Sequence, residues 1–478
     1  MNPFHTHPIQ KLQKKEQFNK KAVQAERWIH SHWILSLIAL VLGLLTLKGV
    51  YGTWHAGHSI SVKQIFMEAV GSGLKTDGQG HTNILLLGVG GEGHDGENLT
   101  DTMIVASLNQ SENTVSMVSI PRDLYVETEA VGWGTRVNSI YELVYDESED
   151  RAIAEAALEE ELESMMNIDI QYYAKIDFNS FKEIIDAVDG ITVNVTEDIA
   201  DLAYPADPGS SSVYDPFYLS VGTHTLDGET ALKYVRSRHN TSDFSRAQRQ
   251  QEVLQALKDK ATSLGVLTSP SKIKDLYSAI ANNFESNMSL TELLALAEFG
   301  SDLEEGAIQN AVFNDLAYTK GGFLYTPERE EGDPYYLFPY AGDFSELALF
   351  ARVFLYHPEI ARDQVTIRVL NGTKTSSLAG LTKMMLVRYG FNALPPQNAE
   401  TKDVIKTQIY LLPTSTEEEQ EIVERTAQLI PLLVDGEISE DVPPAYQSDT
   451  EAQIVIVLGA DFASFYAEHE ELFYIGFY

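Results

Sequence analysis

Positive charge is concentrated between residues 231 and 251, a stretch rich in arginine. Its five basic side chains and one acidic side chain give it a local charge of +4, whereas the whole chain carries −36. Arginine suits phosphate because its planar guanidinium stays charged and donates two parallel hydrogen bonds. The stretch therefore predicts a phosphate site, and the alternative is an ordinary solvated basic face. Its charged residues are Lys233, Arg236, Arg238, Asp243, Arg246 and Arg249.

The spacing of these arginines indicates two groups. Arg236 and Arg238 are two positions apart, which on a β-strand places both guanidinium groups on one side. Arg246, Arg249 and Gln250 follow the i, i+3, i+4 spacing of one helical face. The acidic residue that precedes this helix could cap its first turn or orient an arginine.

Two aspartates in a glycine-rich loop are candidates for binding a divalent cation. The segment 83–109 reads as a strand, a loop and a second strand headed by Asp101, with Asp95 earlier in the loop. Carboxylate oxygens are the ligands that hard cations such as Mg²⁺ prefer. The loop lacks the Gly-Lys-Ser/Thr sequence of a nucleotide-binding P-loop. A solvated loop carboxylate is the alternative interpretation of both residues.

Arg122 and Asp123 form a third candidate group. The apolar stretch 114–120 predicts a strand that stops at Pro121, and the two opposite charges follow directly. Side chains just beyond a strand end lie where ligands of α/β folds collect, although an ion pair at a turn would look the same. Carboxylates for a cation, together with several arginines and no nucleotide motif, are typical of pyrophosphate chemistry, in which metal and arginine neutralise the leaving group.

The composition excludes several classes of function. A chain of 478 residues predicts two to four domains. Its acidity argues against nonspecific nucleic-acid binding, because a polyanion is repelled by phosphate backbones. The absence of cysteine rules out disulfides, thiolate zinc sites and cysteine nucleophiles.

Residues 33–47 form an uncharged apolar run that predicts a membrane anchor. With its flank up to residue 54 the run reaches the roughly 20 residues that a spanning helix needs, and aromatic residues lie at both ends. Basic residues dominate 1–32, so we expect a cytoplasmic leader, one transmembrane signal-anchor helix at 33–54, and an extracytoplasmic bulk on the cell membrane. A cleaved signal peptide is the alternative, but no clear small-x-small site follows the run.

Alternating strands and helices predict an α/β fold for the exported part. Residues 55–80 are expected to form a linker, 81–362 a catalytic domain with a helical extension, and 363–478 a small α/β C-terminal domain. The acidic insert at 434–452 carries two prolines and is expected to be a loop. The expected strands are 83–89, 103–109, 114–120, 191–195, 365–372, 408–413 and 453–459, and the expected helices are 150–166, 178–188, 246–262, 290–304, 377–390 and 416–430.

A series of short motifs resembles the LytR-CpsA-Psr family. The motifs are LLLGV at 85–89, TDTM at 100–103, SIPRD at 119–123, VNSIY at 137–141, IDIQYYAKIDF at 168–178, VDGITVNV at 188–195, LDGETALKYVRSRH at 226–239 and DFSRAQRQQ at 243–251. The tail is similar to the LytR-type C-terminal domain often attached in this family, on IRVLNG at 367–372, YGF at 389–391 and LGADF at 458–462.

The resemblance implies both a fold and a function. Members of the family have an α/β sandwich with a central mixed sheet and a hydrophobic tunnel for a polyprenyl chain, preceded by one transmembrane helix. They transfer glycopolymers from a polyprenyl-pyrophosphate carrier to peptidoglycan, and some also hydrolyse the pyrophosphate. The resemblance therefore implies a magnesium-dependent phosphotransferase of cell-wall assembly. Two alternatives are a lipid pyrophosphatase without glycan coupling and a non-enzymatic envelope regulatory protein.

The resemblance also assigns residues to roles. Asp101 is expected to bind Mg²⁺. Where the family carries a second aspartate this chain has the segment 89–91, so Asp95 (or Glu92) is expected to supply that ligand from the loop. The residues expected in catalysis are Arg122, Asp123, Arg236 and Arg238. Those expected to bind the substrate are Arg136, Asp243, Arg246, Arg249 and Gln250.

Overall fold

A computed structural model describes most of the chain from residue 73 onward. The described residues are 73–205, 214–237, 243–266, 269, 284–304, 306–330, 332–447, 449–469 and 473. Among them, no helix is both long and apolar enough to cross a membrane. The predicted leader at 1–32 and anchor at 33–54 lie outside the described residues.

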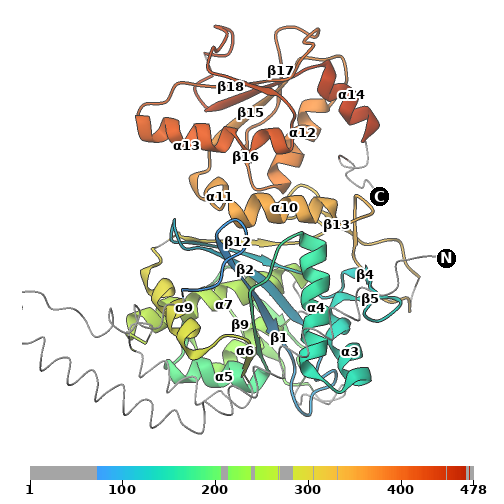
Figure 1. Ribbon diagram of the computed structural model, residues 1–478, viewed down its shortest axis with the longest axis vertical. Helices are drawn as coiled ribbons and strands as arrows, with labels where there is room; N and C mark the ends of the chain where they lie inside the picture. Colours follow the sequence, from blue (N-terminus) through green and yellow to red (C-terminus); the bar gives the residue numbers. More distant parts are fainter. Residues whose placement is uncertain are drawn as a thin grey trace, which may run out of the picture. The chain divides into compact units, whose positions relative to one another are not determined.

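A mixed sheet lies at the centre of the N-terminal part (Figure 1). Its strands are β1 (His81–Gly88), β2 (Thr102–Asn109), β3 (Thr114–Ser119), β6 (Tyr172–Ile176), β11 (Phe284–Ser286) and β12 (Ile308–Val312), in the order β11-β6-β1-β2-β3-β12. β1, β2 and β3 are antiparallel neighbours, whereas β6 runs parallel to β1 and β12 runs parallel to β3. The expected central mixed sheet and its first three strands are therefore confirmed.

Helices cover both faces of this sheet, which explains why its central strands β1, β2 and β3 are buried over most of their length. Leu85 and Leu87 pack into the same core as α4 (Arg151–Met166) and α10 (Ser345–Tyr356). The alternate residues Leu86 and Ile104 pack on the other side of the sheet. Their partners are Leu254 of α7 (Asp243–Ser263) and residues of α9 (Leu290–Asp302). The helices expected at 150–166, 246–262 and 290–304 are confirmed, with ends shifted by a few residues.

A second, smaller core lies beside the sheet. The expected strand at 191–195 is β7, but it pairs with β10 (Gly222–Leu226) outside the central sheet. Helix α5 (Phe178–Ala187) and helix α6 (Gly228–Arg236) pack on this pair, and both begin at an aspartate cap. The short antiparallel pair β8 (Ile199–Asp201) and β9 (Phe217–Leu219) contributes Ile199 and Phe217 to the same core.

The structure corrects three expectations. Arg236 is the last residue of helix α6 and therefore does not lie on the strand considered for Arg236 and Arg238; Asp227 accepts a hydrogen bond from the Thr230 amide and caps this helix. The insert at 434–452 contains the edge strand β19 (Glu437–Ser439). The described end of the predicted linker, 73–80, is packed on the domain, because Leu74 is buried and Asp77 accepts a hydrogen bond from the Tyr356 hydroxyl at 2.7 Å.

The C-terminal part has its own sheet with the order β16-β15-β20-β18-β19. Its strands are β15 (Thr366–Asn371), β16 (Asn392–Ala393), β17 (Gln397–Asn398), β18 (Gln408–Leu411), β19 and β20 (Ile454–Leu458), and its helices are α12 (Leu378–Arg388), α13 (Glu417–Ala427) and α14 (Ala460–Glu468). The strands and helices expected between 365 and 459 are confirmed. The shorter elements of the chain are β4 (Tyr125–Glu127), β5 (Gly134–Arg136), η1 (Val137–Ser139), α3 (Ile140–Ser148), β13 (Leu324–Tyr325), β14 (Phe338–Pro339), α11 (Glu359–Asp363) and η2 (Ile430–Leu432).

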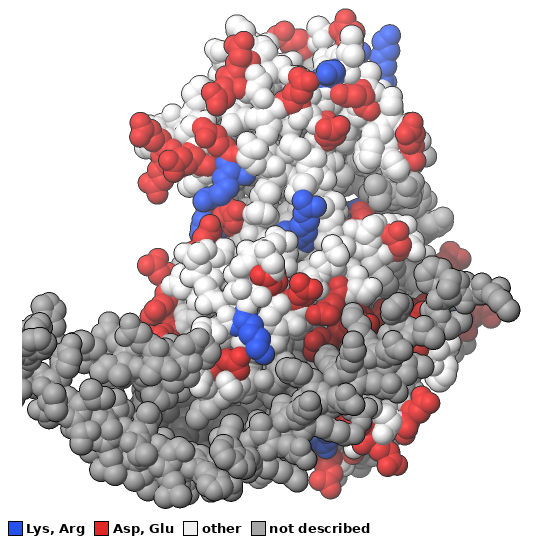
Figure 2. Space-filling model, in the orientation of Figure 1, with Lys and Arg blue, Asp and Glu red and all other residues white. Residues whose placement is uncertain are grey.

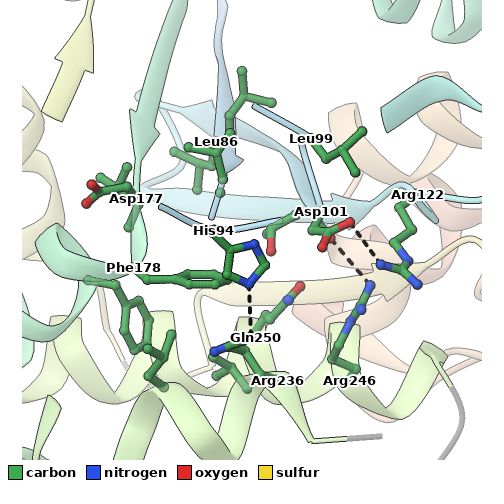
Figure 3. Close-up of a pocket in the computed structure, with 18 of the residues that line it drawn as sticks. Leu86, His94, Leu99, Asp101, Arg122, Asp177, Phe178, Arg236, Arg246 and Gln250 are labelled. Atoms are coloured by element: carbon green, nitrogen blue, oxygen red, sulfur yellow. Dashed lines mark hydrogen bonds and ion pairs between the residues drawn. The ribbon is translucent and has the colours of Figure 1, made fainter. Parts of the chain in front are cut away.

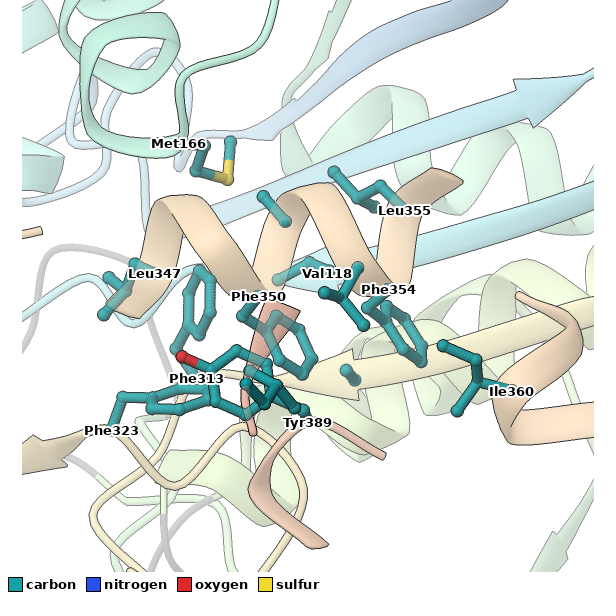
Figure 4. Close-up of a cluster of buried hydrophobic side chains, with 14 of the residues drawn as sticks. Val118, Met166, Phe313, Phe323, Leu347, Phe350, Phe354, Leu355, Ile360 and Tyr389 are labelled. Carbon is teal, nitrogen blue, oxygen red and sulfur yellow. The ribbon is translucent and has the colours of Figure 1, made fainter. Parts of the chain in front are cut away.

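An aromatic cluster around Phe350 of α10 joins elements from both parts of the chain (Figure 4). The Phe350 ring lies 5.5 Å from that of Phe313, 5.4 Å from that of Phe323, 5.1 Å from that of Phe354 and 6.2 Å from that of Tyr389. Phe350 is fully buried. Because Tyr389 follows α12, the central sheet of the N-terminal part and the C-terminal part share one hydrophobic core.

This packing predicts that Phe350→Ala lowers the free energy of unfolding by about 3–5 kcal/mol, since it leaves a cavity among rings that cannot collapse into it. Urea unfolding followed by circular dichroism measures the change. The matched control is Tyr318→Ala, whose aromatic ring is 63% exposed and whose loss should change stability by no more than about 0.5 kcal/mol. Equal effects of the two substitutions would contradict the shared core.

Candidate functional site

A cavity of about 660 Å³ opens between the ends of β1, β2 and β6 and the helices α5, α6 and α7. Much of its wall is apolar, and charged side chains line another part of it; in Figure 3 they extend across the view from Asp177 to Arg122. The apolar wall includes Leu86, Ile104, Ala174, Ile176, Phe181, Leu232, Val235 and Leu254. The charged and polar lining includes His94, Asp95, Asp101, Arg122, Asp177, Arg236, Arg246 and Gln250. One cavity therefore combines an apolar chamber with a polar mouth.

Asp101 is the centre of the polar mouth. It directly precedes β2, and its Oδ1 accepts hydrogen bonds from Arg122 Nη1 at 2.9 Å and from Asn138 Nδ2 at 3.1 Å. Its backbone carbonyl accepts a further bond from Arg246 Nη2 at 3.4 Å. Arg122 follows β3, Asn138 lies in η1 and Arg246 lies in α7, so one residue holds three separate elements together.

Helix α7 presents one face to the cavity. Arg246, Gln250 and Leu254, each four residues from the next, line the cavity. The Arg249 guanidinium lies outside that lining; its Nε donates to the Tyr234 carbonyl at 2.9 Å, and its Nη2 donates to the Ser237 carbonyl. Arg249 thus satisfies carbonyls at the end of α6 that have no partner inside that helix. The expectation that it shares a face with Arg246 and Gln250 is wrong.

Arg236 reaches the mouth from the end of α6. Its guanidinium carbon lies 4.3 Å from the centre of the Phe178 ring, and its Nη1 donates to the Tyr204 hydroxyl at 3.1 Å. Burial raises the pKa of Tyr204, so this hydroxyl stays protonated. The Arg236 Nη2 lies 3.2 Å from His94 Nε2. Since a guanidinium can only donate, His94 Nε2 accepts, and its Nδ1–H donates to the Asp95 carbonyl at 2.7 Å.

Two further carboxylates, those of Asp95 and Asp177, line the same cavity. Asp177 follows β6 and caps α5, accepting a bond from the Ser180 amide at 2.8 Å. Gly91, at φ +84°, lies against it, because a Cβ at that position would approach the Asp177 Cβ to 2.8 Å. The glycine segment after β1 therefore makes room for a carboxylate from the neighbouring parallel strand. Glu92, by contrast, is exposed and lies outside the cavity lining.

Asp123 and Arg136 lie behind the mouth and outside the cavity lining. Asp123 is 7% exposed, and its carboxylate pairs with Arg122 Nε at 3.4 Å and with Arg136 Nε at 3.2 Å. This places Asp123 as a bridge that orients Arg122. Arg238 and the Asp243 side chain lie outside the described residues, so their expected roles stay predictions.

The model of the LytR-CpsA-Psr family matches residues 56–332, more than half of the chain. The chain belongs to the LytR-CpsA-Psr family. A second model, described as LytR cell envelope-related transcriptional attenuator, matches residues 364–462.

The relatives of this LytR-CpsA-Psr protein include two curated enzymes from Bacillus subtilis (strain 168). TagT is 29% identical over 253 residues, which are 52% of this chain and 72% of TagT. TagU is 28% identical over 272 residues, which are 54% of this chain and 79% of TagU. Both are named polyisoprenyl-teichoic acid–peptidoglycan teichoic acid transferases. The crystal structure of B. subtilis TagV is 26% identical, with a TM-score of 0.43 over 57% of this chain and 96% of TagV.

The mouth of the LytR-CpsA-Psr domain offers a donor set that suits magnesium. Mg²⁺ usually takes one or two carboxylates and completes its shell with water and substrate phosphates. Asp101 and Asp95 can supply the carboxylates. Within the described part of the chain, no three acidic or histidine side chains gather as a complete metal site, so phosphate and water would supply the rest. Burial, with smaller contributions from the carboxylates of Asp146, Glu97 and Asp101, raises the pKa of Glu142 beside the mouth.

Several residues of the mouth were missed by the sequence analysis. His94 adjoins Asp95 in the glycine-rich loop, and Asn138 and Asp177 lie within the VNSIY and IDIQYYAKIDF motifs, so a local signal existed for these three. Phe178 is the last residue of the IDIQYYAKIDF motif, whereas Tyr204 reaches Arg236 from a distant segment that no local pattern marks. Acidic side chains are spread over the visible face in Figure 2, whereas basic ones are few; the enclosed arginines are therefore an exception to the general charge.

The contacts of Arg249 predict a structural role that can be measured. Arg249→Ala should lower the free energy of unfolding by about 2–4 kcal/mol, because two buried carbonyls lose their donor. Thermal and urea unfolding would report the loss. Arg425→Ala is the control, since the Arg425 side chain is 42% exposed and pairs only with Asp363 among the ion pairs described; its effect should stay below about 1 kcal/mol. A stable Arg249→Ala protein would show that the capping contacts carry little energy.

Proposed function

We propose that this chain is a phosphotransferase that moves a glycopolymer from a polyprenyl-pyrophosphate carrier onto peptidoglycan. The observation that carries the proposal is the single cavity in which an apolar chamber meets a mouth containing three arginines. Such a cavity suits a ligand with a long apolar chain and a compact, highly charged head. The names of the relatives TagT and TagU support the same carrier and acceptor.

The chain's own residues can perform most of the work on the pyrophosphate. Arg122, Arg236 and Arg246 come from three elements, and each is fixed by a hydrogen bond before any ligand enters. Preorganised donors stabilise charge that develops on the leaving phosphate without a further cost of reorganisation. The acceptor hydroxyl forms a bond to the sugar-linked phosphorus and releases its proton, while the phosphoanhydride bond breaks and polyprenyl phosphate leaves with the electron pair. With water as acceptor the same site would act as a pyrophosphatase.

Magnesium is part of this proposal. Asp101 and Asp95 would hold the ion, which would neutralise charge on the pyrophosphate. We further propose that residues 33–54 anchor the chain in the cytoplasmic membrane with the N-terminus inside, since an extracytoplasmic site beside the bilayer would meet both the lipid carrier and the cell wall. This part of the proposal rests on the apolar run and the basic leader.

The stacking of Arg236 on Phe178 predicts that Arg236→Lys lowers the rate of glycan transfer by about 100-fold. Lysine keeps the charge but loses the planar fork that reaches His94, Tyr204 and a phosphate together. The assay uses the full-length chain in detergent micelles, a polyprenyl-pyrophosphate glycan and nascent peptidoglycan, and follows glycan joined to the wall.

Lys406→Ala is the matched control for this substitution, because Lys406 is an exposed cation of the C-terminal part. Transfer by the control should equal that of the wild type. Phosphate release without joined glycan would favour the pyrophosphatase, and undiminished transfer by Arg236→Lys would refute the assignment of the arginine mouth.

The magnesium proposal predicts that chelation with EDTA abolishes transfer and that added Mg²⁺ restores it. Asp101→Asn should require a higher Mg²⁺ concentration for half-maximal rate and lower the maximal rate by about 10-fold or more, since a ligand charge is lost while the amide can still accept from Arg122 and Asn138. Full activity after exhaustive chelation would overturn the metal requirement. Asp441→Asn, at an exposed carboxylate of the C-terminal part, serves as the control.

A further inference from the structure

A strip of five aromatic rings lies next to the arginine mouth. The rings belong to Tyr336, Tyr125, Phe338, Tyr325 and Tyr340, in spatial order. Successive ring centres are 5.3 Å, 5.0 Å, 6.0 Å and 5.3 Å apart. We call this set the aromatic strip. Its rings come from β4, β13, β14 and the residues beside them, so segments about 200 positions apart in sequence build one surface.

Strand alternation turns the rings of Tyr125, Tyr325, Tyr336 and Phe338 away from the core, whereas the fifth ring, that of Tyr340, lies 5.6 Å from the guanidinium of the buried Arg388. The residues next to them, Leu124, Leu324 and Leu337, are at most 1% exposed and point into the core, so their neighbours in each strand must point to the opposite side. The Tyr325 ring is 37% exposed, and the other four are half-buried. A Cβ on Gly134 would meet the Tyr125 ring, so the absence of a side chain at this position lets the ring lie flat across β5.

The aromatic strip is connected directly to the proposed active site. The Tyr125 amide donates to the Leu337 carbonyl at 2.9 Å, and the Leu337 amide donates to the Asp123 carbonyl at 2.9 Å. Arg136 faces Tyr125 across β4 and β5, and its guanidinium lies 5.6 Å from the centre of the Tyr336 ring while it pairs with Asp123. A ligand on the strip would therefore lie against Arg136, which is linked through Asp123 to Arg122 of the mouth.

The chemistry of the strip favours an uncharged chain of sugar rings. Partly exposed aromatic rings offer apolar area at low entropic cost, and the tyrosine hydroxyl groups can hydrogen-bond at the edge. The segments that follow Tyr125 and Tyr325 carry the exposed residues Glu127, Glu129, Glu328, Arg329 and Glu330. Four negative charges against one positive charge would repel a polyanionic donor polymer.

We infer that the aromatic strip binds the glycan strand of the acceptor peptidoglycan and holds it against the arginine mouth. The inference rests on the proposed transferase function and adds the acceptor subsite. Continuity with Asp123 and Arg136 selects a ligand of the reaction over an unrelated protein, and the acidic border selects the acceptor over the anionic donor. The strip residues position the acceptor and take no part in the chemistry.

The test is direct binding of a β-1,4-linked N-acetylglucosamine hexamer to the full-length chain in detergent micelles, measured by isothermal titration calorimetry. Tyr336→Ala and Tyr325→Ala should each weaken binding by about tenfold, the value of one aromatic contact. Tyr325→Phe keeps the ring and should stay within about twofold of the wild type. In the transfer assay, the alanine variants should raise KM for peptidoglycan and leave kcat unchanged.

Tyr318→Ala is the matched control, because it removes a tyrosine that is 63% exposed and lies outside the strip; it should bind like the wild type. Unfolding midpoints confirm that each variant is folded. No hexamer binding by the wild type, or unchanged binding by both alanine variants, would overturn the inference. A polyglycerol-phosphate oligomer is the remaining test ligand. If it bound more tightly than the hexamer and the same substitutions weakened its binding, the strip would belong to the donor and the inference would be overturned. Binding needs no turnover, so its failure is separate from failure of the transferase proposal.

Discussion

The hydrogen bond between Asp101 and Arg122 is the interaction on which the polar mouth depends. Three guanidinium groups inside one small cavity repel one another, and each would lose hydration there unless a carboxylate or carbonyl compensated. Asp101 offers both, with its side chain to Arg122 and Asn138 and its carbonyl to Arg246. Its place directly before β2 fixes it to the central sheet, so the sheet sets the position of the charged residues around it.

Much of the fold could be predicted because strands that are buried on both faces are rich in apolar residues, and such segments are recognisable in a sequence. Strands β1, β2 and β3 are buried over most of their length and are rich in apolar residues, and the helices between the strands show the expected spacing. The errors occurred where local pattern is ambiguous. The short segment ending at Arg236 has aliphatic and basic residues that suit a strand or a helix, and only the cap at Asp227 decides for the helix. In the C-terminal part, β19 is a three-residue edge strand within an acidic, proline-containing insert, so its own residues give little indication of a strand.

The site was predictable to the extent that its residues lie in dense local motifs. Asp101, Arg122, Arg236, Arg246 and Gln250 were predicted and line one cavity. Arg249 shows why helical spacing alone does not identify the residues that line a cavity. Positions i+3 and i+4 point in different directions around the helix axis, and the Arg249 guanidinium donates to the Tyr234 carbonyl at the end of α6. Tyr204 and Phe178 depend on tertiary approach, which no single stretch of sequence encodes.

The apolar chamber has a consequence for turnover. Cleavage at the pyrophosphate leaves the lipid tail chemically unchanged, so substrate and spent carrier would make the same contacts with Leu86, Ile104 and Leu254. Binding that is equal before and after reaction adds nothing to the chemical step, but it holds the product in place. Escape of that product then requires another apolar solvent for the tail. A bilayer beside the opening would supply one. Release of the spent carrier into the membrane would then limit the rate of turnover.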